Sequence, residues 1–141
     1  MRNTARWAAA LGLAATAAFG PLAGAATAAP EASSLVLTAR YGDTYTTLTT
    51  DPAAPQFSEV TLTCSPSASG SHPYAPSACA ELRRVDGDLD ALQPTPGVMC
   101  PMYFDPIVVT VDGVWEGRHV SYERTFGNAC VKSTYGSVFA F

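Results

Sequence analysis

One run, Ile107-Val108-Val109-Thr110-Val111-Asp112-Gly113-Val114-Trp115-Glu116-Gly117, sets the fold class of this chain. Its first five residues are all β-branched, which predicts a buried strand. Asp112-Gly113 and Glu116-Gly117 are both typical of a tight hairpin turn, and the sequence leaves the choice between them open. Polar and apolar residues then alternate from Arg118 to Phe126, as in a second strand. We therefore expect a hairpin in this region.

Three other segments have the composition of strands. Leu35–Tyr41 is rich in aliphatic residues, Val60–Cys64 alternates apolar with polar side chains, and Ser137–Phe141 can form a last strand. In a parallel fold, strands and helices alternate regularly along the chain. The strand segments of this sequence do not alternate with helical ones in that way. The sequence therefore predicts an α+β domain with a five-stranded antiparallel sheet, and with one or two short helices packed on one face.

A helix is expected in the middle of the chain, where Ser77 is a suitable N-cap for a helix that begins near Ala78. Apolar side chains recur near one face at helical spacing, at Cys79, Leu82, Val85, Leu89 and Leu92. Asp86-Gly87 can end this helix early, which would leave the residues after it as a second short turn.

The first 28 residues have the pattern of a secretory signal peptide. A basic start is followed by an Ala/Leu-rich apolar run from Trp7 to Phe19 and by a small-residue cleavage site at Ala26-Thr27-Ala28. Gly20-Pro21 interrupts the run before it reaches the roughly 20 apolar residues that a membrane span needs. We expect cleavage after Ala28, which exports one mature domain, residues 29–141, to the extracellular space.

Cleavage would leave an acidic domain, because Arg2 and Arg6 depart with the signal peptide. Six basic and twelve acidic residues remain, which is a net charge of −6. The only adjacent basic pair is Arg83-Arg84, and a solvated helix face accounts for it. An acidic secreted domain without a basic cluster is a poor candidate for binding nucleic acid or an anionic membrane, so we expect neither as a partner.

In an exported domain we expect the four cysteines to form two disulfides: Cys64, Cys79, Cys100 and Cys130. Their spacing contains no C-x-x-C pair and matches no zinc pattern. His72 lies in a polar loop and His119 in a predicted strand with no ligand nearby in the sequence. We therefore expect no metal and no cofactor.

A secreted hydrolase is the alternative that the serines and the two histidines raise. The chain has no Gly-x-Ser-x-Gly elbow. It is also a short chain from which to build the layers of structure that support a catalytic cleft. We therefore expect that the protein is not an enzyme.

A proline-flanked loop precedes the strand at Ile107, with the sequence Val98-Met99-Cys100-Pro101-Met102-Tyr103-Phe104-Asp105-Pro106. Proline fixes φ and lacks an N–H donor, so this run is suited neither to a helix interior nor to a central strand. On the residues alone two interpretations stay open. Either Met102, Tyr103 and Phe104 fold back onto the sheet edge, or a rigid loop displays Met102 as bait for a proteolytic enzyme. Rigid loops lose little entropy on binding, and proteases bind their substrates as extended strands.

This loop and several other segments resemble the Streptomyces subtilisin inhibitor family over nearly all of the predicted mature chain. The segments that carry the resemblance are Leu62-Thr63-Cys64, Ser71-His72-Pro73, Cys79-Ala80-Glu81-Leu82, Cys100-Pro101-Met102, Val111–Trp115 and Val120–Arg124. The resemblance implies a secreted, homodimeric α+β protein that inhibits subtilisin-type serine proteases. Members of the family act like substrates, inserting a reactive-site loop into the active site of the protease.

By this resemblance Met102 is the primary specificity residue, and Met102–Tyr103 is the reactive peptide bond. Met99 corresponds to a position that fills a second pocket. The other loop residues that the resemblance places against the protease are Cys100, Pro101, Phe104 and Asp105. Tyr103 is bulkier than the aliphatic residue usual after the reactive bond, and Phe104 lacks the hydroxyl of a usual tyrosine, which leaves fine specificity open.

The resemblance also pairs Cys64 with Cys79 and Cys100 with Cys130. Asn128 matches an asparagine that braces the loop from behind, although a turn residue after Gly127 is an equally good interpretation on local grounds. The connection from Tyr41 to Phe57 is several residues longer than in the relatives.

Two further expectations concern partners. The same apolar loop fits an alternative function, that of a secreted binding module for a partner other than a protease. For the homodimer we expect the packing of sheet faces, with Leu35, Val36 and Leu37 in or beside the interface, because this strand is apolar on successive residues.

Overall fold

A computed structural model describes residues 31–42 and 57–141 of the chain. The predicted signal peptide and most of the connection from Tyr41 to Phe57 lie outside the described residues. Within the described ranges no helix is long and apolar enough to cross a membrane.

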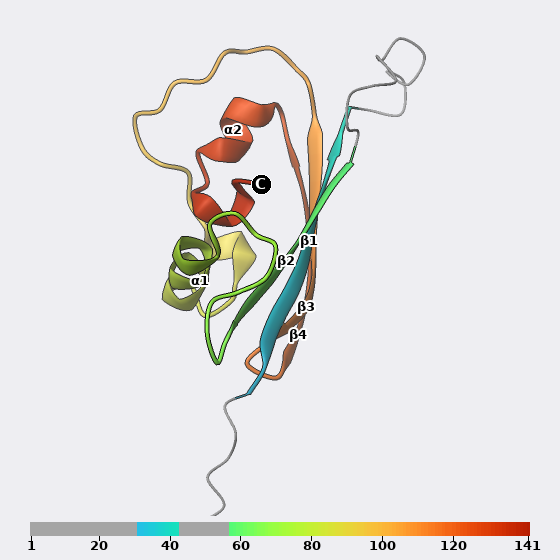
Figure 1. Ribbon diagram of the computed structural model, residues 1–141. Helices are drawn as coiled ribbons and strands as arrows, with labels where there is room; N and C mark the ends of the chain where they lie inside the picture. The colour runs from blue at the N-terminus through green and yellow to red at the C-terminus, as the bar shows by residue number, and fades with distance from the viewer. Residues whose placement is uncertain (1–30, 43–56) are drawn as a thin grey trace, which may run out of the picture.

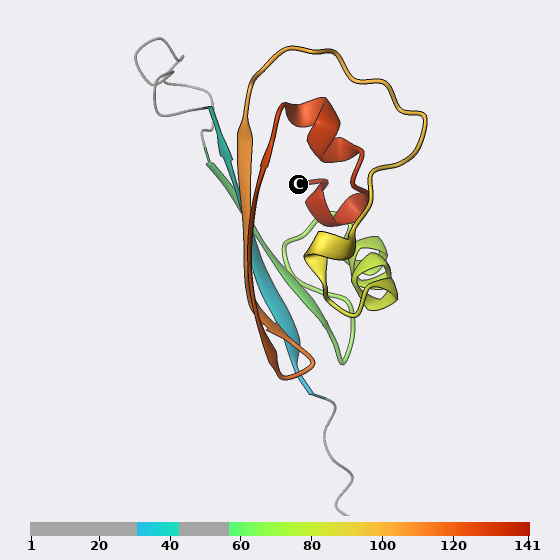
Figure 2. The same cartoon turned by 180° about the vertical axis from the view of Figure 1, so that it is seen from behind.

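In the described part of the chain, strands form one antiparallel sheet with the order β2-β1-β3-β4. The strands are β1 Ser33–Tyr41, β2 Phe57–Ser65, β3 Ile107–Trp115 and β4 Arg118–Phe126. The helices are α1 Ala75–Arg84 and α2 Ala129–Ser133, with short 3₁₀ turns η2 Leu89–Ala91 and η3 Ser137–Phe139. All of them lie on one side of the sheet, and the other side is open (Figures 1 and 2). The α+β class and the antiparallel sheet are confirmed.

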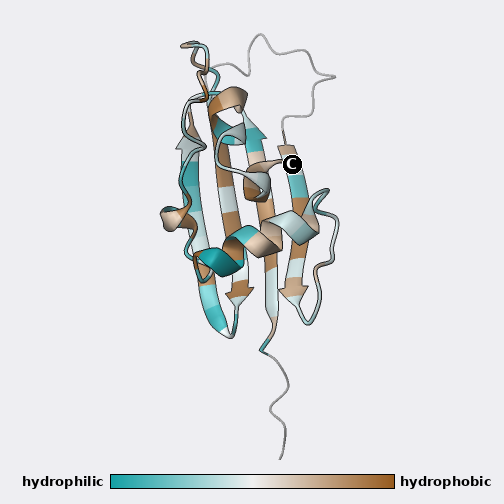
Figure 3. Ribbon diagram, turned by 90° about the vertical axis from the view of Figure 1, so that its left-hand side faces the viewer, coloured by the Kyte–Doolittle hydropathy of each residue, from teal (hydrophilic) through white to brown (hydrophobic). Residues whose placement is uncertain are grey.

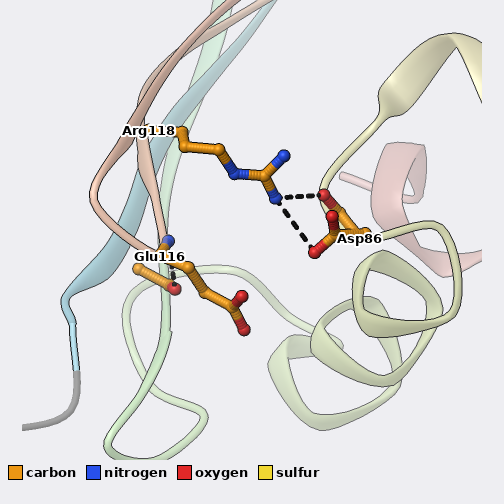
Figure 4. Close-up of polar contacts among 4 residues, drawn as sticks. Asp86, Glu116 and Arg118 are labelled. Atoms are coloured by element: carbon orange, nitrogen blue, oxygen red, sulfur yellow. Dashed lines mark hydrogen bonds and ion pairs between the residues drawn. The ribbon is translucent and has the colours of Figure 1, made fainter.

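The β3–β4 hairpin turns at Glu116-Gly117, which resolves the choice that the sequence left open. Trp115 pairs with Arg118 across the turn, and both intervening residues have positive φ, 46° and 77°. This is the geometry of the two-residue turn that matches strand twist. The N–H of Glu116 also donates to Oγ of Ser33, 3.0 Å away, which ties the turn to the start of β1 (Figure 4).

Asp112-Gly113 is instead part of β3. Gly113 has φ 151°, and a Cβ at this position would lie 2.2 Å from the carbonyl oxygen of Ser34 in the neighbouring strand. A glycine is needed here because β1 approaches too closely for any side chain, not because the chain reverses.

The core lies between the helices and the facing side of the sheet. Leu35, Leu37 and Ala39 alternate with more exposed residues along β1, and Trp115 and Phe139 are among the large side chains that they pack with. Figure 3 shows α1 lying across the sheet. Apolar residues on successive positions of β1 therefore serve two different faces of the sheet. Leu35 and Leu37 are buried beneath the helices, and of the three residues expected at a dimer interface only Val36 lies on the open face.

The prediction of a fifth strand at Ser137–Phe141 is wrong. Ser137–Phe139 form η3, with Val138 and Phe139 completely buried. The carboxylate of Glu81 on α1 accepts hydrogen bonds from the N–H groups of Ser137 and Val138, at 3.1 and 3.2 Å, and from the Ser137 hydroxyl. A side chain distant in sequence therefore takes the N–H groups that a strand would have used in a sheet ladder.

The start of α1 also differs from the prediction. The helix begins at Ala75, with Tyr74 rather than Ser77 in the N-cap position, and Pro76 occupies its first turn. Proline suits this place because N–H groups of the first turn have no partner inside the helix.

The early end of the helix is confirmed: α1 stops at Arg84, and η2 forms a separate turn after Asp86-Gly87. Arg118 of β4 fastens this end, with Nη2 2.9 Å from Oδ1 of Asp86 (Figure 4).

Candidate functional site

The proline-flanked loop leaves η2 and arches over α2 before it enters β3 (Figures 1 and 2). Between Leu92 and Pro106 it forms no helix or strand. Its apolar side chains point away from the protein: Met102 is 100% exposed, Met99 94% and Phe104 75%. Within the run from Val98 only Pro106 is buried. The interpretation that Met102 folds back onto the sheet edge is therefore wrong.

A disulfide joins the loop to the helix beneath it, since Cys100 is bonded to Cys130 of α2. The second disulfide, Cys64–Cys79, joins β2 to α1. Both pairs are those that the family resemblance implies. Cys100 lies two residues before Met102, so the covalent tether acts next to the most exposed side chain of the loop.

Asn128 holds the loop from behind. It is 3% exposed, and its amide nitrogen donates hydrogen bonds to the carbonyl oxygens of Pro101, 3.1 Å away, and Tyr103, 2.9 Å away. Its amide oxygen accepts the N–H of Val131 at 3.0 Å, which makes Asn128 the N-cap of α2. Asn128 therefore has two roles. Its amide oxygen caps α2 in the turn after Gly127, and its amide nitrogen remains free to hold the loop.

Two further tethers were not predicted from the sequence. At the beginning of the loop, the N–H and the hydroxyl of Thr95 both donate to the carbonyl oxygen of Thr134, at 2.7 and 3.0 Å. At its end, the N–H of Asp105 donates to the carbonyl oxygen of Gly127, 2.9 Å away. Every residue carries a carbonyl oxygen, so no pattern in the sequence marks these particular acceptors.

The short helix α2 is itself anchored. Lys132 is buried, and its Nζ donates to the carbonyl oxygen of Phe141, 2.7 Å away, and lies 4.9 Å from the centre of the Phe141 ring. Burial lowers the pKa of Lys132 from its ordinary value, because the charged form loses hydration. The helix that Asn128 caps and that contains Cys130 is thereby held against the C-terminal segment.

The histidines do not form a catalytic group in the described part of the chain. Nδ1 of His72 accepts the N–H of Tyr74 at 3.0 Å, and its Nε2 donates to the carbonyl oxygen of Val138 at 3.1 Å, so both ring nitrogens are engaged by the main chain. His119 is exposed on β4. Over residues 31–42 and 57–141, no three His, Cys, Asp or Glu side chains gather in a way that could hold a metal ion.

Comparison with known proteins identifies the family of this chain. The model of the family described as subtilisin inhibitor-like matches residues 31–128, which include the whole exposed loop and Asn128. The chain belongs to the subtilisin inhibitor-like family.

Relatives in this family of inhibitors align over most or all of the chain. A trypsin inhibitor from Streptomyces longisporus is 57% identical over the full length of both chains. A subtilisin inhibitor from Streptomyces albogriseolus is 53% identical and covers 86% of each chain. Among solved structures, sermetstatin from Streptomyces caespitosus, determined in complex with subtilisin from Bacillus licheniformis, has a TM-score of 0.61 and 39% identity. That match covers 79% of this chain and 99% of sermetstatin.

Proposed function

We propose that this protein is a secreted, substrate-like inhibitor of subtilisin-type serine proteases, with Met102–Tyr103 as its reactive bond. The observation that carries the proposal is the placement of Met102. Its side chain is fully exposed, while the carbonyl groups on either side, those of Pro101 and Tyr103, are both held by Asn128. Membership of the family, and the solved complex of sermetstatin with subtilisin, support the same partner class.

The tethers explain why such a loop inhibits a protease instead of serving as an ordinary substrate. After cleavage of Met102–Tyr103, the new ends of a flexible substrate would diffuse apart. Here Cys100–Cys130 holds the segment before the bond, the Asp105–Gly127 hydrogen bond holds the segment after it, and Asn128 holds both. The amine therefore stays beside the acyl group, and religation competes with release.

The exposed side chains account for affinity and selectivity. Met102 enters the primary pocket of the protease, where burial of such a side chain is worth roughly 1.5–3 kcal/mol. Met99 fills a second pocket, and Cys100, Pro101, Phe104 and Asp105 complete the contact surface. Because the loop is already rigid, little of this energy is lost in ordering it, and standard-sized protease–inhibitor interfaces then reach roughly nanomolar affinity or tighter.

Titration of subtilisin with the purified protein tests the proposal. We expect loss of activity that is complete near one inhibitor domain per enzyme. An undiminished rate at equimolar protein would overturn the proposal and favour the alternative, a binding module that uses the same loop for a partner other than a protease.

Two parts of the proposal concern location and assembly. Residues 1–28 act as the signal peptide that exports the domain, which N-terminal sequencing of the secreted protein would test.

Two copies form a homodimer through the open faces of their sheets. The support for this interface is that the helices cover only one face, while Val36 and Val114 on the other are 40% and 36% exposed.

A further inference from the structure

We propose that Met102 is a site of reversible oxidation, and that peroxide converts the free protein into an inactive form by oxidising this side chain to the sulfoxide. The inference rests on the proposed inhibitory function and adds a control to it. It follows from a conflict in the structure: the side chain that must be apolar to bind is also the one most open to oxidants in solution.

The structure leaves the Met102 side chain accessible to oxidants in solution. Methionines in protein cores are shielded, but the Met102 side chain is 100% exposed and Met99 is 94% exposed. The loop cannot retreat, because Asn128 fixes the carbonyl groups before and after Met102 and the Cys100–Cys130 disulfide fixes its approach. The rigidity that presents Met102 to a protease therefore presents it equally to small oxidants.

Little else in the mature domain competes for the oxidant. The only other methionine is Met1, which lies in the predicted signal peptide. All four cysteines of the chain are in disulfides, so no thiol is present to react first. Trp115 is 2% exposed in the core. Two-electron oxidants should thus act on Met102 and Met99 before other side chains.

The reaction balances with hydrogen peroxide as the oxidant. The thioether sulfur attacks one peroxide oxygen, an S–O bond forms, the O–O bond breaks, and water leaves after proton transfer. Sulfur loses two electrons and peroxide gains them. The product carries a polar S=O group in place of an apolar thioether, and methionine sulfoxide reductases reverse the change, one enzyme for each epimer.

The modified side chain would oppose binding in the primary pocket. An apolar pocket offers no donor to the S=O oxygen, so burial costs a polar group its hydration and the favourable burial of the thioether is lost. We expect the inhibition constant for subtilisin to rise roughly 100-fold when Met102 is oxidised. Oxidation of Met99 should have a smaller effect, because it lies three residues from the reactive bond.

The protease should in turn protect Met102. In the complex this side chain occupies the enzyme pocket and loses its exposure, so oxidation and inhibition exclude each other. Oxidant would thus inactivate free inhibitor and spare inhibitor that has already bound a protease.

The experiment treats the purified protein with hydrogen peroxide, removes the peroxide with catalase and gel filtration, and adds the product to fresh subtilisin. Peptide mass spectrometry locates each added oxygen, about 16 Da. The Met99→Leu and Met102→Leu variants are each compared with themselves before and after treatment, so a changed starting affinity does not matter. We expect a roughly 100-fold loss for the wild type and for Met99→Leu, and a loss of less than about threefold for Met102→Leu.

Incubation of the oxidised protein with both sulfoxide reductases should restore inhibition, and peroxide treatment of the preformed complex should leave Met102 unmodified. Full inhibition by protein whose Met102 is shown to be sulfoxide would overturn the inference. So would a loss that follows Met99 instead of Met102. A protein that fails to inhibit before any peroxide is added would overturn the proposed function itself, which keeps the two failures distinct.

Discussion

The amide nitrogen of Asn128 lies 2.9 Å from the carbonyl oxygen of Tyr103 and donates a hydrogen bond to it. The same nitrogen reaches the carbonyl oxygen of Pro101, so one buried side chain spans the peptide bond proposed as reactive. Its amide oxygen begins α2 by accepting the N–H of Val131. Asn128 therefore joins the loop to the helix beneath it, beside the covalent link of Cys100–Cys130, and its amide nitrogen and amide oxygen have different roles.

Replacement of Asn128 should separate these two roles. Serine can still cap α2, whereas neither serine nor alanine can reach the loop carbonyls. We expect Asn128→Ser and Asn128→Ala to weaken inhibition of subtilisin alike, by roughly 10- to 100-fold, because the loop is no longer preorganised. Only Asn128→Ala should lose the further stability of the cap, about 1 kcal/mol in denaturant unfolding. Inhibition by Asn128→Ser that matches the wild type would show that the loop does not need this brace.

The Met102→Lys variant should shift inhibition toward trypsin-like enzymes, whose primary pocket holds a carboxylate. We expect the inhibition constant for trypsin to fall by at least about tenfold and that for subtilisin to rise, as measured on a panel of both enzymes. Met102→Gly serves as the comparison and should weaken both. If neither variant alters either profile, another segment makes the contact.

The two disulfides should differ in what their removal does. They close loops of 15 and 30 residues, and on the chain-entropy model each loss costs about 3–4 kcal/mol, somewhat more for Cys100–Cys130. Replacing Cys100 and Cys130 by serine should also free the approach to Met102 and give a temporary inhibitor that subtilisin cleaves. Replacing Cys64 and Cys79 should leave inhibition largely intact where the fold survives. Mass spectrometry after overnight incubation with enzyme measures both, and equal cleavage would place the reactive site elsewhere.

Stability should fall on mild acidification because of His72. Burial lowers the pKa of His72, although its hydrogen bond to Val138 and the charge of Glu81 oppose this effect; the Lys132 charge lowers it further. A histidine with a lowered pKa takes up its proton less readily when folded than when unfolded. The contribution of His72 to the free energy of unfolding is complete above the ordinary pKa of 6.5. This contribution is lost as the pH falls from there through the pKa that His72 has in the folded protein.

We therefore expect the free energy of unfolding of the wild type to decrease between pH 7 and pH 5 in denaturant titrations. His72→Gln should flatten this dependence, and His119→Gln, at an exposed position, should retain it. A slope that persists in His72→Gln would assign the effect to another group. Glu81 acts in a lower window: burial alone would raise its pKa, but the hydrogen bonds from Ser137 and Val138 outweigh it and lower the pKa, so its contribution is lost below about pH 4.5.

The dimer proposal predicts that a charge on the open sheet face separates the copies. Val36 lies on this face in the central strand β1, whereas Ala80 is exposed on α1 on the opposite side. We expect sedimentation equilibrium at micromolar concentration to give a dimer for the wild type and for Ala80→Glu, and a monomer for Val36→Glu. A monomeric wild type would contradict the proposal.

Much of the fold could be predicted because the strands carry their own periodicity. The β-branched run of β3 and the alternation in β2 and β4 mark strands whatever surrounds them, since side chains on a strand point alternately to opposite faces. The end of α1 could also be predicted, because Asp86-Gly87 interrupts the helical pattern locally. The exposed loop was recognisable from Pro101 and Pro106, and the family from its landmarks around the cysteines.

Tertiary structure decided what depends on partners distant in sequence. Ser137–Phe141 has the composition of a strand, but the Glu81 carboxylate takes its N–H groups and turns it into η3. Gly113 and Gly117 both look like turn residues; only the close approach of β1 shows that the first of them sits within a strand. Whether Met102 is hidden or displayed likewise depends on an acceptor and a donor in the turn between β4 and α2, the carbonyl oxygen of Gly127 and the amide nitrogen of Asn128. A pattern along the chain records which faces are apolar, whereas the pairing of polar groups across the fold arises only when the chain is packed.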